Sequence, residues 1–386
     1  MRVAIAGGGI AGLASALLLA RRGHDITVFE AQDYAAGGNG ILLQPAGLDV
    51  LERLGLASRA LALGCAIDGI TSRDRDGASL MDLRYAELRP GLRALGIRRP
   101  VLAALLRDAA ITAGVRLNCH CGIEALENQP GDISLVERLT RAAHGPFDLA
   151  LVCDGLNSRL RQSIAGGAEV RTHRQGVYSV VAPLPESIPP NLLVQRLDGL
   201  RDAVGLLPIG KAGGDTPLVS FFWNAPVSGR AELEARGYDS WCAGIESFCP
   251  EARGWLRNLG SFASLPFFTT AQITMRRWHE GRALVMGDAA HALDPHLGVG
   301  ATMALLDAEC LDQCLLTTGN DVTAALADFE TRRRRALSAY VRVSCGWSQL
   351  DGSGFSALRR RLFLAAAGGF NPLRRRLLTY ICGYAS

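Results

Sequence analysis

Three glycines near the start of the chain have the spacing of a loop that cradles phosphate groups. The short apolar run Arg2–Ala6 precedes the pattern G-x-G-x-x-G at Gly7, Gly9 and Gly12. In such a loop the first glycine permits a tight turn, the second lets the backbone approach a pyrophosphate, and the third lets a helix pack against the strand. The helix expected from Ala11 to Arg22 would direct its free N–H groups at the phosphates.

An acidic residue after the next expected strand extends this pattern. The strand Asp25–Phe29 is followed by Glu30, eighteen residues after Gly12, where a carboxylate can accept hydrogen bonds from an adenosine ribose. The alternatives are a glycine-rich turn without a ligand and a secretory signal peptide. A signal peptide fits poorly, because glycines interrupt the apolar stretch and a strand follows it directly. The sequence therefore predicts a dinucleotide site.

Two later stretches place an aspartate beside a glycine at the end of an expected strand. Asp154 and Gly155 follow the apolar run Phe147–Cys153, and Gly287 and Asp288 follow Arg282–Met286. Runs that are apolar throughout are typical of strands inside a parallel sheet, and ligands bind at the carboxyl ends of such strands. The second stretch continues into a segment with a histidine and two glycines, Asp294-Pro295-His296-Leu297-Gly298-Val299-Gly300.

The order of expected strands and helices around these motifs indicates an α/β fold with an insertion. Apolar strands alternate with expected helices at both ends of the chain. Consecutive strands with short connections are expected within about 171–275, and this range also contains a helical stretch at 231–248. We therefore expect a discontinuous nucleotide-binding domain, an inserted antiparallel sheet domain, and a C-terminal helical segment. The expected boundaries are 1–70, 98–170 and 276–340 for the first, 71–97 and 171–275 for the second, and 341–386 for the third.

The composition fits a compact cytoplasmic enzyme. The chain has 386 residues, 48% of them hydrophobic, and 44 glycines. A net charge of +4 and the lack of a basic–aromatic patch do not suggest nucleic acid. No apolar run is long enough to span a bilayer without a charge or a glycine. The ten cysteines lack the paired C-x-x-C spacing of zinc sites, so we expect reduced thiols and no metal site.

In order and spacing, the three glycine motifs resemble those of the single-component FAD-dependent aromatic hydroxylases, the para-hydroxybenzoate hydroxylase-like family. The resemblance covers roughly 1–55, 97–165 and 276–340. It implies a Rossmann-like FAD-binding domain with an inserted antiparallel-sheet substrate domain and C-terminal helices. It also implies FAD and NADPH or NADH as cofactors, with O2 and an aromatic small molecule as substrates.

The resemblance also implies cofactor contacts for individual residues. Asp288, beside Gly287, would hydrogen-bond the ribityl chain of FAD. The backbone of Gly298, Val299 and Gly300 would face the flavin pyrimidine ring, where a helix N-terminus stabilises the negative charge of reduced flavin. The family often has glutamine and asparagine where this chain has Val299 and Thr302, which leaves side-chain contacts there open. The remaining expected contacts are Arg99 with the phosphates (or Arg98 in its place), Asp154 and Gly155 with FAD and nicotinamide, Arg159 nearby, and the backbone of Ile123 with adenine.

The implied reaction is the hydroxylation of an aromatic or heteroaromatic small molecule. NAD(P)H would reduce FAD, and a flavin C4a-hydroperoxide formed with O2 would deliver one oxygen atom to the ring. The chain has no second G-x-G-x-x-G, so the nicotinamide must bind without a Rossmann domain of its own. His296 and the adjacent Pro295 are the catalytic candidates, with His296 in position to deprotonate the substrate, against the alternative of a loop histidine bonded to backbone. His291 is interpreted as structural.

The walls of the substrate cavity are expected to come from the inserted sheet. Phe221 and Trp223 alternate with their neighbours, so they share one face of a strand, and Leu207 and Pro208 are candidates to join them. A sheet that packs its own core explains the same residues. A dry cavity is required because water near the flavin adduct would release peroxide.

Other functions share parts of this pattern. A flavin halogenase would need a G-W-x-W-x-I-P stretch that is absent from the sequence. A reductase of the geranylgeranyl reductase type has the same fold without hydroxylating, and a redox-sensing flavoprotein would not be an enzyme. The basic clusters Arg332–Arg335, Arg359–Arg361 and Arg374–Arg376 fit either a helix on an anionic membrane surface or basic helices that cap the flavin domain. The sequence leaves monomer and homodimer open.

Overall fold

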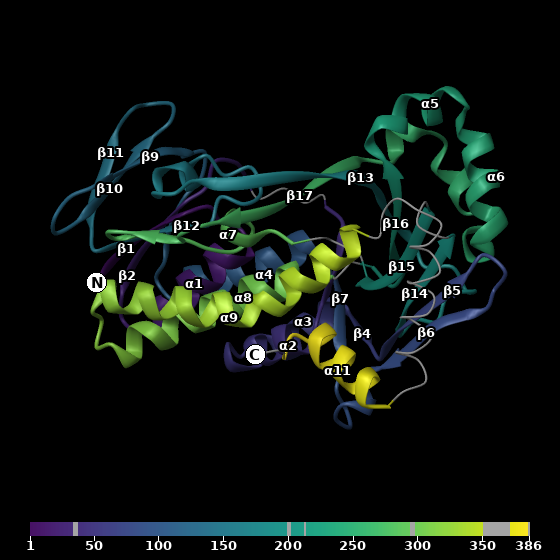
Figure 1. Cartoon of the computed structure of the whole chain (residues 1–386), viewed down its shortest axis with the longest axis horizontal. Coiled ribbons are helices and arrows are strands. Elements are labelled where there is room, and N and C mark those ends of the chain that lie inside the picture. The colour runs from purple at the N-terminus through teal and green to yellow at the C-terminus, as the bar shows by residue number, and fades with distance from the viewer. Residues whose placement is uncertain (34–37, 199–201, 212–213, 294–297, 350–370, 385–386) are drawn as a thin grey trace.

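A six-stranded sheet, built from separate pieces of the chain, forms the first half of the molecule (Figure 1). The computed structural model describes residues 1–33, 38–198, 202–211, 214–293, 298–349 and 371–384. Strands run in the order β18-β19-β12-β1-β2-β8 and pair in parallel, except for β18 with β19. The strands are β1 (Arg2–Ala6), β2 (Asp25–Phe29), β8 (Arg116–Asn118), β12 (Leu149–Val152), β18 (His279–Glu280) and β19 (Ala283–Val285).

Helices cover this sheet and bury its apolar strands. The first helix, α1, follows β1 directly because a run rich in alanine and leucine favours helix. It ends two residues before Gly23, whose φ of +83° allows the N–H groups of Gly23 and His24 to bond the carbonyls of Ala20 and Leu19. The helices of this half are α1 (Ile10–Arg21), α2 (Pro45–Arg53), α3 (Ala57–Leu63), α4 (Arg99–Thr112), α7 (Asp288–His291), α8 (Gly300–Thr317) and α9 (Val322–Gln349).

A seven-stranded sheet forms the second half, in the order β17-β13-β16-β15-β14-β5-β6. The expected antiparallel pairing holds among the described strands except between β14 and β5, which are parallel. These two strands come from distant pieces of the chain, so no hairpin joins them. The strands are β5 (Gly69–Asp74), β6 (Ser79–Arg84), β13 (Ala168–Pro183), β14 (Leu192–Asp198), β15 (Asp202–Lys211), β16 (Pro217–Pro226) and β17 (Phe267–Met275).

Two helices pack on one face of this second sheet, where the sequence predicts a single helical stretch. They are α5 (Arg230–Ala235) and α6 (Tyr238–Phe248). The break lies at Gly237, whose φ of +89° is in the left-handed region and cannot continue an α-helix. The aromatic side chains of α6 and of the sheet form a core separate from that of the first sheet.

Two smaller sheets and a C-terminal helix complete the fold. The sheet β3-β7-β4 lies against the seven-stranded sheet, so closely that a Cβ on Gly96 would lie 1.9 Å from the carbonyl oxygen of Pro208. The sheet β11-β10-β9 is a meander that the sequence does not predict. The elements are β3 (Gly40–Leu43), β4 (Cys65–Ile67), β7 (Ala94–Arg98), β9 (Ile123–Asn128), β10 (Ile133–Glu137), β11 (Ala143–Phe147) and α11 (Asn371–Ile381), with short 3₁₀ turns that include η1 (Tyr85–Glu87) and η2 (Leu160–Ser163).

The two large sheets are joined by a pair of long strands. Strands β13 and β17 run side by side between them (Figure 1) and pair from Ala168 with Met275 to Tyr178 with Phe267. Their register shifts between Thr172 and Gly176. Because one strand pair serves both halves, the domain boundaries expected from the sequence stay a prediction.

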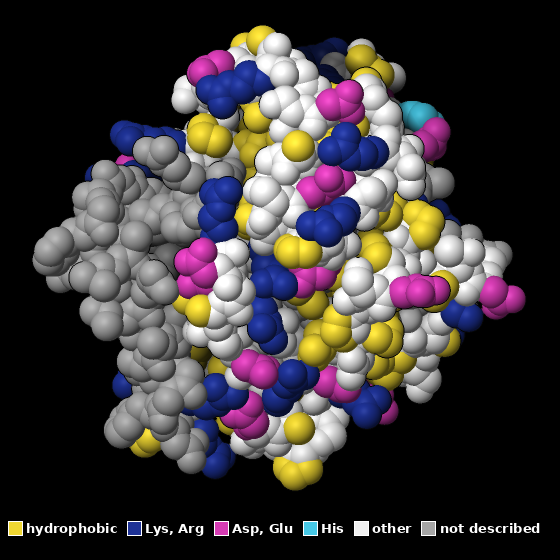
Figure 2. Space-filling model, turned by 90° about the vertical axis from the view of Figure 1, so that its right-hand side faces the viewer, with side chains coloured by type: hydrophobic (Ala, Val, Ile, Leu, Met, Phe, Trp, Pro, Cys, Tyr) yellow, Lys and Arg dark blue, Asp and Glu magenta, His cyan; other side chains and the backbone are white. Residues whose placement is uncertain are grey.

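The surface beyond the seven-stranded sheet carries charges of both signs. Figure 2 shows basic and acidic side chains interspersed on the part of this face that the structure describes. Ion pairs in this half of the molecule include Arg84 with Asp82 on β6 and Arg257 with Glu246 on α6. Within the described residues, no helix combines the length and the apolar character that crossing a bilayer requires.

A buried aspartate on α8 fixes the end of strand β19. Asp307 accepts hydrogen bonds from the backbone N–H of Gly287 at 2.8 Å and from the Arg333 Nε at 2.6 Å, and it lies 2.6 Å from the His291 Nε2. Burial alone would raise the pKa of Asp307, but the charges of His291 and Arg333 and the hydrogen bonds outweigh burial and lower it to about 2. The structural role expected for His291 agrees with this network.

We expect Asp307→Asn to lower the free energy of unfolding by about 3–5 kcal/mol at neutral pH, because Arg333 would lose its buried counter-charge. The folded pKa of about 2 lies below the ordinary value of 3.8, so the carboxylate stabilises the fold above pH 3.8 and this contribution is lost as the pH falls towards 2. Chemical denaturation of both proteins across this range should show their stabilities converging.

A difference in stability that stays constant down to the lowest pH would contradict the charge argument. Asp328→Asn is the matched control, since Asp328 pairs with Arg332 one turn away on the partly exposed side of α9. That variant should leave the stability nearly unchanged at every pH.

Candidate functional site

The three glycine motifs meet at the carboxyl edge of the six-stranded sheet. The N–H of Cys153 donates to the carbonyl of Ala6 at 2.7 Å, so the ends of β1 and β12 are adjacent. A Cβ on Gly7 would lie 2.4 Å from the carbonyl oxygen of Cys153, and one on Gly287 would lie 3.0 Å from the Cβ of Ala11. Both glycines also have positive φ, so no other residue would fit there without strain. Segments more than a hundred residues apart thus share one small region.

The first motif leaves open space over its middle glycine. A Cβ on Gly12 would lie 2.0 Å from the carbonyl oxygen of Gly7, whereas a Cβ on Gly9 would meet no protein atom within 4 Å. Gly9 is the N-cap of α1, and no side chain caps that end of the helix. The free N–H groups of the first turn therefore face a space that an anionic pyrophosphate would fit.

Glu30 sits beside this loop, at the end of β2. Its carboxylate accepts hydrogen bonds from the backbone N–H groups of Gly8 at 2.7 Å and Gln32 at 3.0 Å. Each carboxylate oxygen has a further lone pair that can accept a ribose hydroxyl. The N–H of Cys121 donates to the carbonyl of Glu30 at 2.8 Å, which brings the segment before Ile123 next to the expected adenosine position.

Behind the second motif lie a buried donor and a buried acceptor that the described residues leave unsatisfied. They are Nη1 of Arg161 and Oδ1 of Asp154. The rest of the Arg161 guanidinium donates to the carbonyls of Ser158, Gly155 and Leu156. Burial raises the pKa of Asp154, against the opposing effect of the Ser158 hydroxyl, and burial lowers the pKa of Arg161, against the charges of Asp154 and Asp288.

This unsatisfied pair fits a polar ligand, because buried polar groups normally have hydrogen-bond partners. The sequence points to Arg159 in this segment, but that side chain is exposed, and Arg161 is the buried one. The helical turn η2 causes the difference, since it turns Arg161 back over its own segment.

The third motif brings Asp288 close to the start of α8. Asp288 begins α7 and is exposed, and its Oδ1 lies 3.8 Å from the position of a Cβ on Gly300. No side chain caps the N-terminus of α8 at Val299, which is itself buried. The free N–H groups of α8 therefore lie beside Asp288, as expected for a flavin site. Pro295 and His296 lie outside the described residues.

A buried amide ties this segment to the inserted sheet. The Nε2 of Gln44 lies 3.8 Å from the position of a Cβ on Gly298, and its Oε1 accepts a hydrogen bond from the Tyr85 hydroxyl at 2.8 Å. The N–H of Gln44 donates to the Thr302 Oγ1 at 2.9 Å, so Thr302 supports the backbone. No motif pointed to Gln44 or Tyr85, because their partners are distant in sequence.

The candidate cavity residues of the inserted sheet lie in two different packing environments. Phe221 and Trp223 are enclosed in the aromatic core under α6, where Trp223 stacks on Tyr178 at 5.4 Å and lies 5.5 Å from Trp241. This burial favours the core interpretation of the two residues, and their role as cavity walls stays a prediction. Leu207 lies on the side of β15 that packs against β7, whereas Pro208 approaches Gly96 of β7 through its backbone carbonyl oxygen.

The structure shows the surroundings of the expected phosphate-binding arginines and of two of the three C-terminal basic clusters. Arg99 is exposed at the first residue of α4, whereas the Nε of Arg98 is buried, and which of them serves a phosphate stays a prediction. Arg374 on α11 pairs with Glu87, and Arg333 is buried beside Asp307. The cluster Arg359–Arg361 lies outside the described residues, so membrane contact also stays a prediction.

Comparison with known proteins gives a consistent result along almost the whole chain. A family model described as "FAD binding domain" matches residues 1–344. The chain is 26% identical over 362 residues to 6-hydroxynicotinate 3-monooxygenase of Bordetella bronchiseptica, covering 89% of this chain and 90% of that protein. It is 28% identical over 355 residues to aurachin C monooxygenase/isomerase of Stigmatella aurantiaca, covering 88% and 87% respectively.

A solved structure shows the same fold. HpxO of Klebsiella pneumoniae, complexed with FAD and uric acid, superposes with a TM-score of 0.82 at 20% sequence identity, covering 100% of this chain and 96% of HpxO. The expected fold class, a Rossmann-like α/β domain with an inserted sheet and C-terminal helices, is confirmed.

We expect Gly9→Ala to fold but to lose most of its FAD, because the new methyl group would occupy the space over the loop without touching protein. The apoprotein should lose about 1 kcal/mol of stability or less. The readouts are the FAD absorbance per chain of the purified protein and the Tm of the apoprotein. Gly12→Ala should instead destabilise the apoprotein itself, since its Cβ would collide with the Gly7 carbonyl.

Gly244→Ala is the control for Gly9, since Gly244 lies in α6 with open space around it. That variant should keep its full FAD content. Full FAD loading of Gly9→Ala would show that the space over the loop is not the pyrophosphate position.

We expect Asp288→Ala to purify largely without yellow colour, because the carboxylate that would accept the ribityl hydroxyls is removed while the fold is left intact. Absorbance spectra and FAD titration of the apoprotein measure the loss. Asp108→Ala, an exposed aspartate on α4, is the control and should retain the cofactor. A fully loaded Asp288→Ala would contradict the assignment.

Proposed function

Because the chain belongs to the FAD-binding-domain family, and within it to the single-component FAD-dependent aromatic hydroxylases, we propose the following reaction for it. The protein uses NADH or NADPH and O2 to insert one oxygen atom into an aromatic or heteroaromatic ring. It is an FAD-dependent monooxygenase. The reductant, the substrate and the individual site residues belong to the proposal.

The convergence of the three glycine motifs carries this proposal. Open space over Gly9, the uncapped starts of α1 and α8, and the unsatisfied Asp154 and Arg161 lie around one edge of the sheet. Phosphate, ribityl and flavin groups are the chemical classes that such donors and acceptors recognise. These donors and acceptors support the assignment of FAD to this edge of the sheet.

Each group of residues has a distinct task. FAD, when bound, supplies the redox chemistry, taking a hydride from the nicotinamide and passing an oxygen atom from O2 to the ring. We propose that the start of α1 binds the pyrophosphate, that Glu30 binds the adenosine ribose, and that Asp288 holds the ribityl chain. The N-terminal amides of α8 would stabilise negative charge on the reduced ring, and the expected oxygen-transfer route stays a prediction.

Of the two faces of the inserted sheet, the one that faces β3 and β7 is the better candidate for the substrate-binding site. Gln44 and Tyr85 meet there beside Gly298, whereas Phe221 and Trp223 are enclosed on the opposite side. A relative named 6-hydroxynicotinate 3-monooxygenase acts, by that name, on a hydroxylated nitrogen heterocycle. We therefore propose a polar-substituted heteroaromatic compound, whose ring substituents a buried amide and phenol could orient by hydrogen bonds.

The test is substrate-stimulated consumption of NADH and NADPH by the purified holoenzyme, screened with hydroxypyridines, quinolones, indoles and phenols. We expect one class to stimulate the rate, to consume O2 in proportion, and to yield a product heavier by one oxygen atom. Mass spectrometry with labelled O2 shows where that atom comes from.

Two outcomes would overturn the proposal. Reduction of a substrate without O2 uptake would identify a reductase of the geranylgeranyl reductase type. An FAD-loaded protein that no compound stimulates, and whose visible spectrum no compound perturbs, would favour a redox-sensing flavoprotein.

A further inference from the structure

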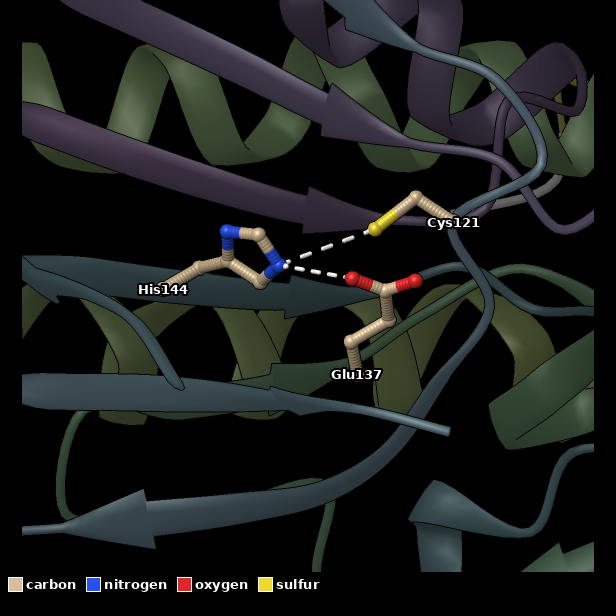
Figure 3. Close-up of side chains that lie close together, drawn as sticks. All are labelled: Cys121, Glu137 and His144. Atoms are coloured by element: carbon tan, nitrogen blue, oxygen red, sulfur yellow. Dashed lines mark hydrogen bonds and ion pairs between the residues drawn. The ribbon is translucent and has the colours of Figure 1, made fainter. Parts of the chain in front are cut away.

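Three side chains capable of binding a metal meet outside the motifs described so far. Cys121 precedes β9, Glu137 ends β10 and His144 lies in β11, and their ligand atoms lie within 4.8 Å of one another. Figure 3 shows the Nε2 of His144 pointing at both the Cys121 sulfur and the Glu137 carboxylate. Cys121 is buried, and the side chains of Glu137 and His144 are 13% and 28% exposed, which leaves one side open to solvent.

The distances between the three side chains also suit a shared metal ion. The His144 Nε2 lies 3.7 Å from the Cys121 Sγ and 3.3 Å from the Glu137 Oε2. Charge-assisted N–H···O bonds are normally about 2.7–2.9 Å long, and one ring nitrogen cannot donate fully to two acceptors. In a tetrahedral zinc site the S–N and N–O edges are about 3.6 Å and about 3.4 Å, from the usual zinc–ligand bond lengths.

Surrounding contacts already hold the three ligands in place. The Thr140 hydroxyl donates to the Glu137 Oε2 at 2.7 Å, and the ring of His144 packs on that of Phe29 at 4.9 Å. The backbone N–H of Cys121 is anchored on the carbonyl of Glu30. Such outer contacts fix ligand orientation in metal sites.

We propose that Cys121, Glu137 and His144 bind one zinc ion, with water at the fourth position. Thiolate, imidazole and carboxylate together suit zinc, whereas magnesium and calcium prefer oxygen ligands alone. The ion fastens the β9-β10-β11 meander to the segment beside Glu30, at the adenosine end of the nucleotide site. The cysteine spacing did not suggest this site, because only one of its three ligands is a cysteine.

The test is equilibrium dialysis of the holoenzyme against zinc, followed by gel filtration and elemental analysis. We expect one zinc per chain in the wild type and none in Cys121→Ser. X-ray absorption at the zinc edge should show one sulfur at about 2.3 Å and nitrogen or oxygen ligands at about 2.0–2.2 Å. Glu137→Gln, a nearly isosteric change at a partly exposed position, should also lose the zinc and covers the case in which Cys121→Ser does not fold.

Cys119→Ser is the matched control, since Cys119 is an exposed thiol two residues away, and it should keep the zinc. A second control is His120→Gln, because exposed His120 lies 2.9 Å from Asp33 and offers an adventitious site. The proposal is overturned if the wild type retains no zinc, if the bound zinc has no sulfur ligand, or if folded Cys121→Ser and Glu137→Gln retain it. None of these outcomes depends on the hydroxylase activity.

Discussion

The close approach of backbone to backbone at one edge of the parallel sheet is the constraint on which the site depends. Strands β1, β12 and β19 are neighbours, so the turns that follow them compete for the same space. Glycine at positions 7 and 287 relieves this crowding, because a side chain on Gly7 would collide with the turn after β12 and one on Gly287 would press on Ala11 of α1. The distance between ligand-binding groups is therefore set by strand spacing, which is nearly invariant in sheets.

Further layers of packing hold the outer parts of the site. Asp307 fixes the start of the third motif from behind, and Gln44 connects the first turn of α8 with Tyr85 near the inserted sheet. Both are buried polar groups whose partners come from different segments. Buried networks of this kind favour one arrangement of their elements, because any other leaves polar atoms unsatisfied.

The sequence predicted the motifs well and their surroundings poorly. Local signals were sufficient for α1 and β2, where glycine spacing and an apolar run specify a strand, a turn and a helix. They failed where pairing is between distant segments, as for β5 with β14 and for the β9-β10-β11 meander, whose alternation is short and irregular. Alternation along β16 placed Phe221 and Trp223 on one face, but periodicity alone cannot tell which face of a sheet is covered by helices. Gln44 and Tyr85 were missed because only tertiary structure makes them neighbours, and Arg161 was missed because the turn η2 that buries it has no clear sequence signal.

The paired strands β13 and β17 have a mechanical consequence. A two-stranded ribbon with cross-strand hydrogen bonds twists more readily than it stretches. In this ribbon the pairing is irregular between Thr172 and Gly176, where a local increase in twist is expected. Near its other end, the N–H of Ile273 is bonded to the carbonyl of Ala292, the residue after α7. The backbone that follows α7 and Asp288 is thus hydrogen-bonded to the same ribbon that continues into the seven-stranded sheet, so the position of that sheet constrains the geometry at Asp288.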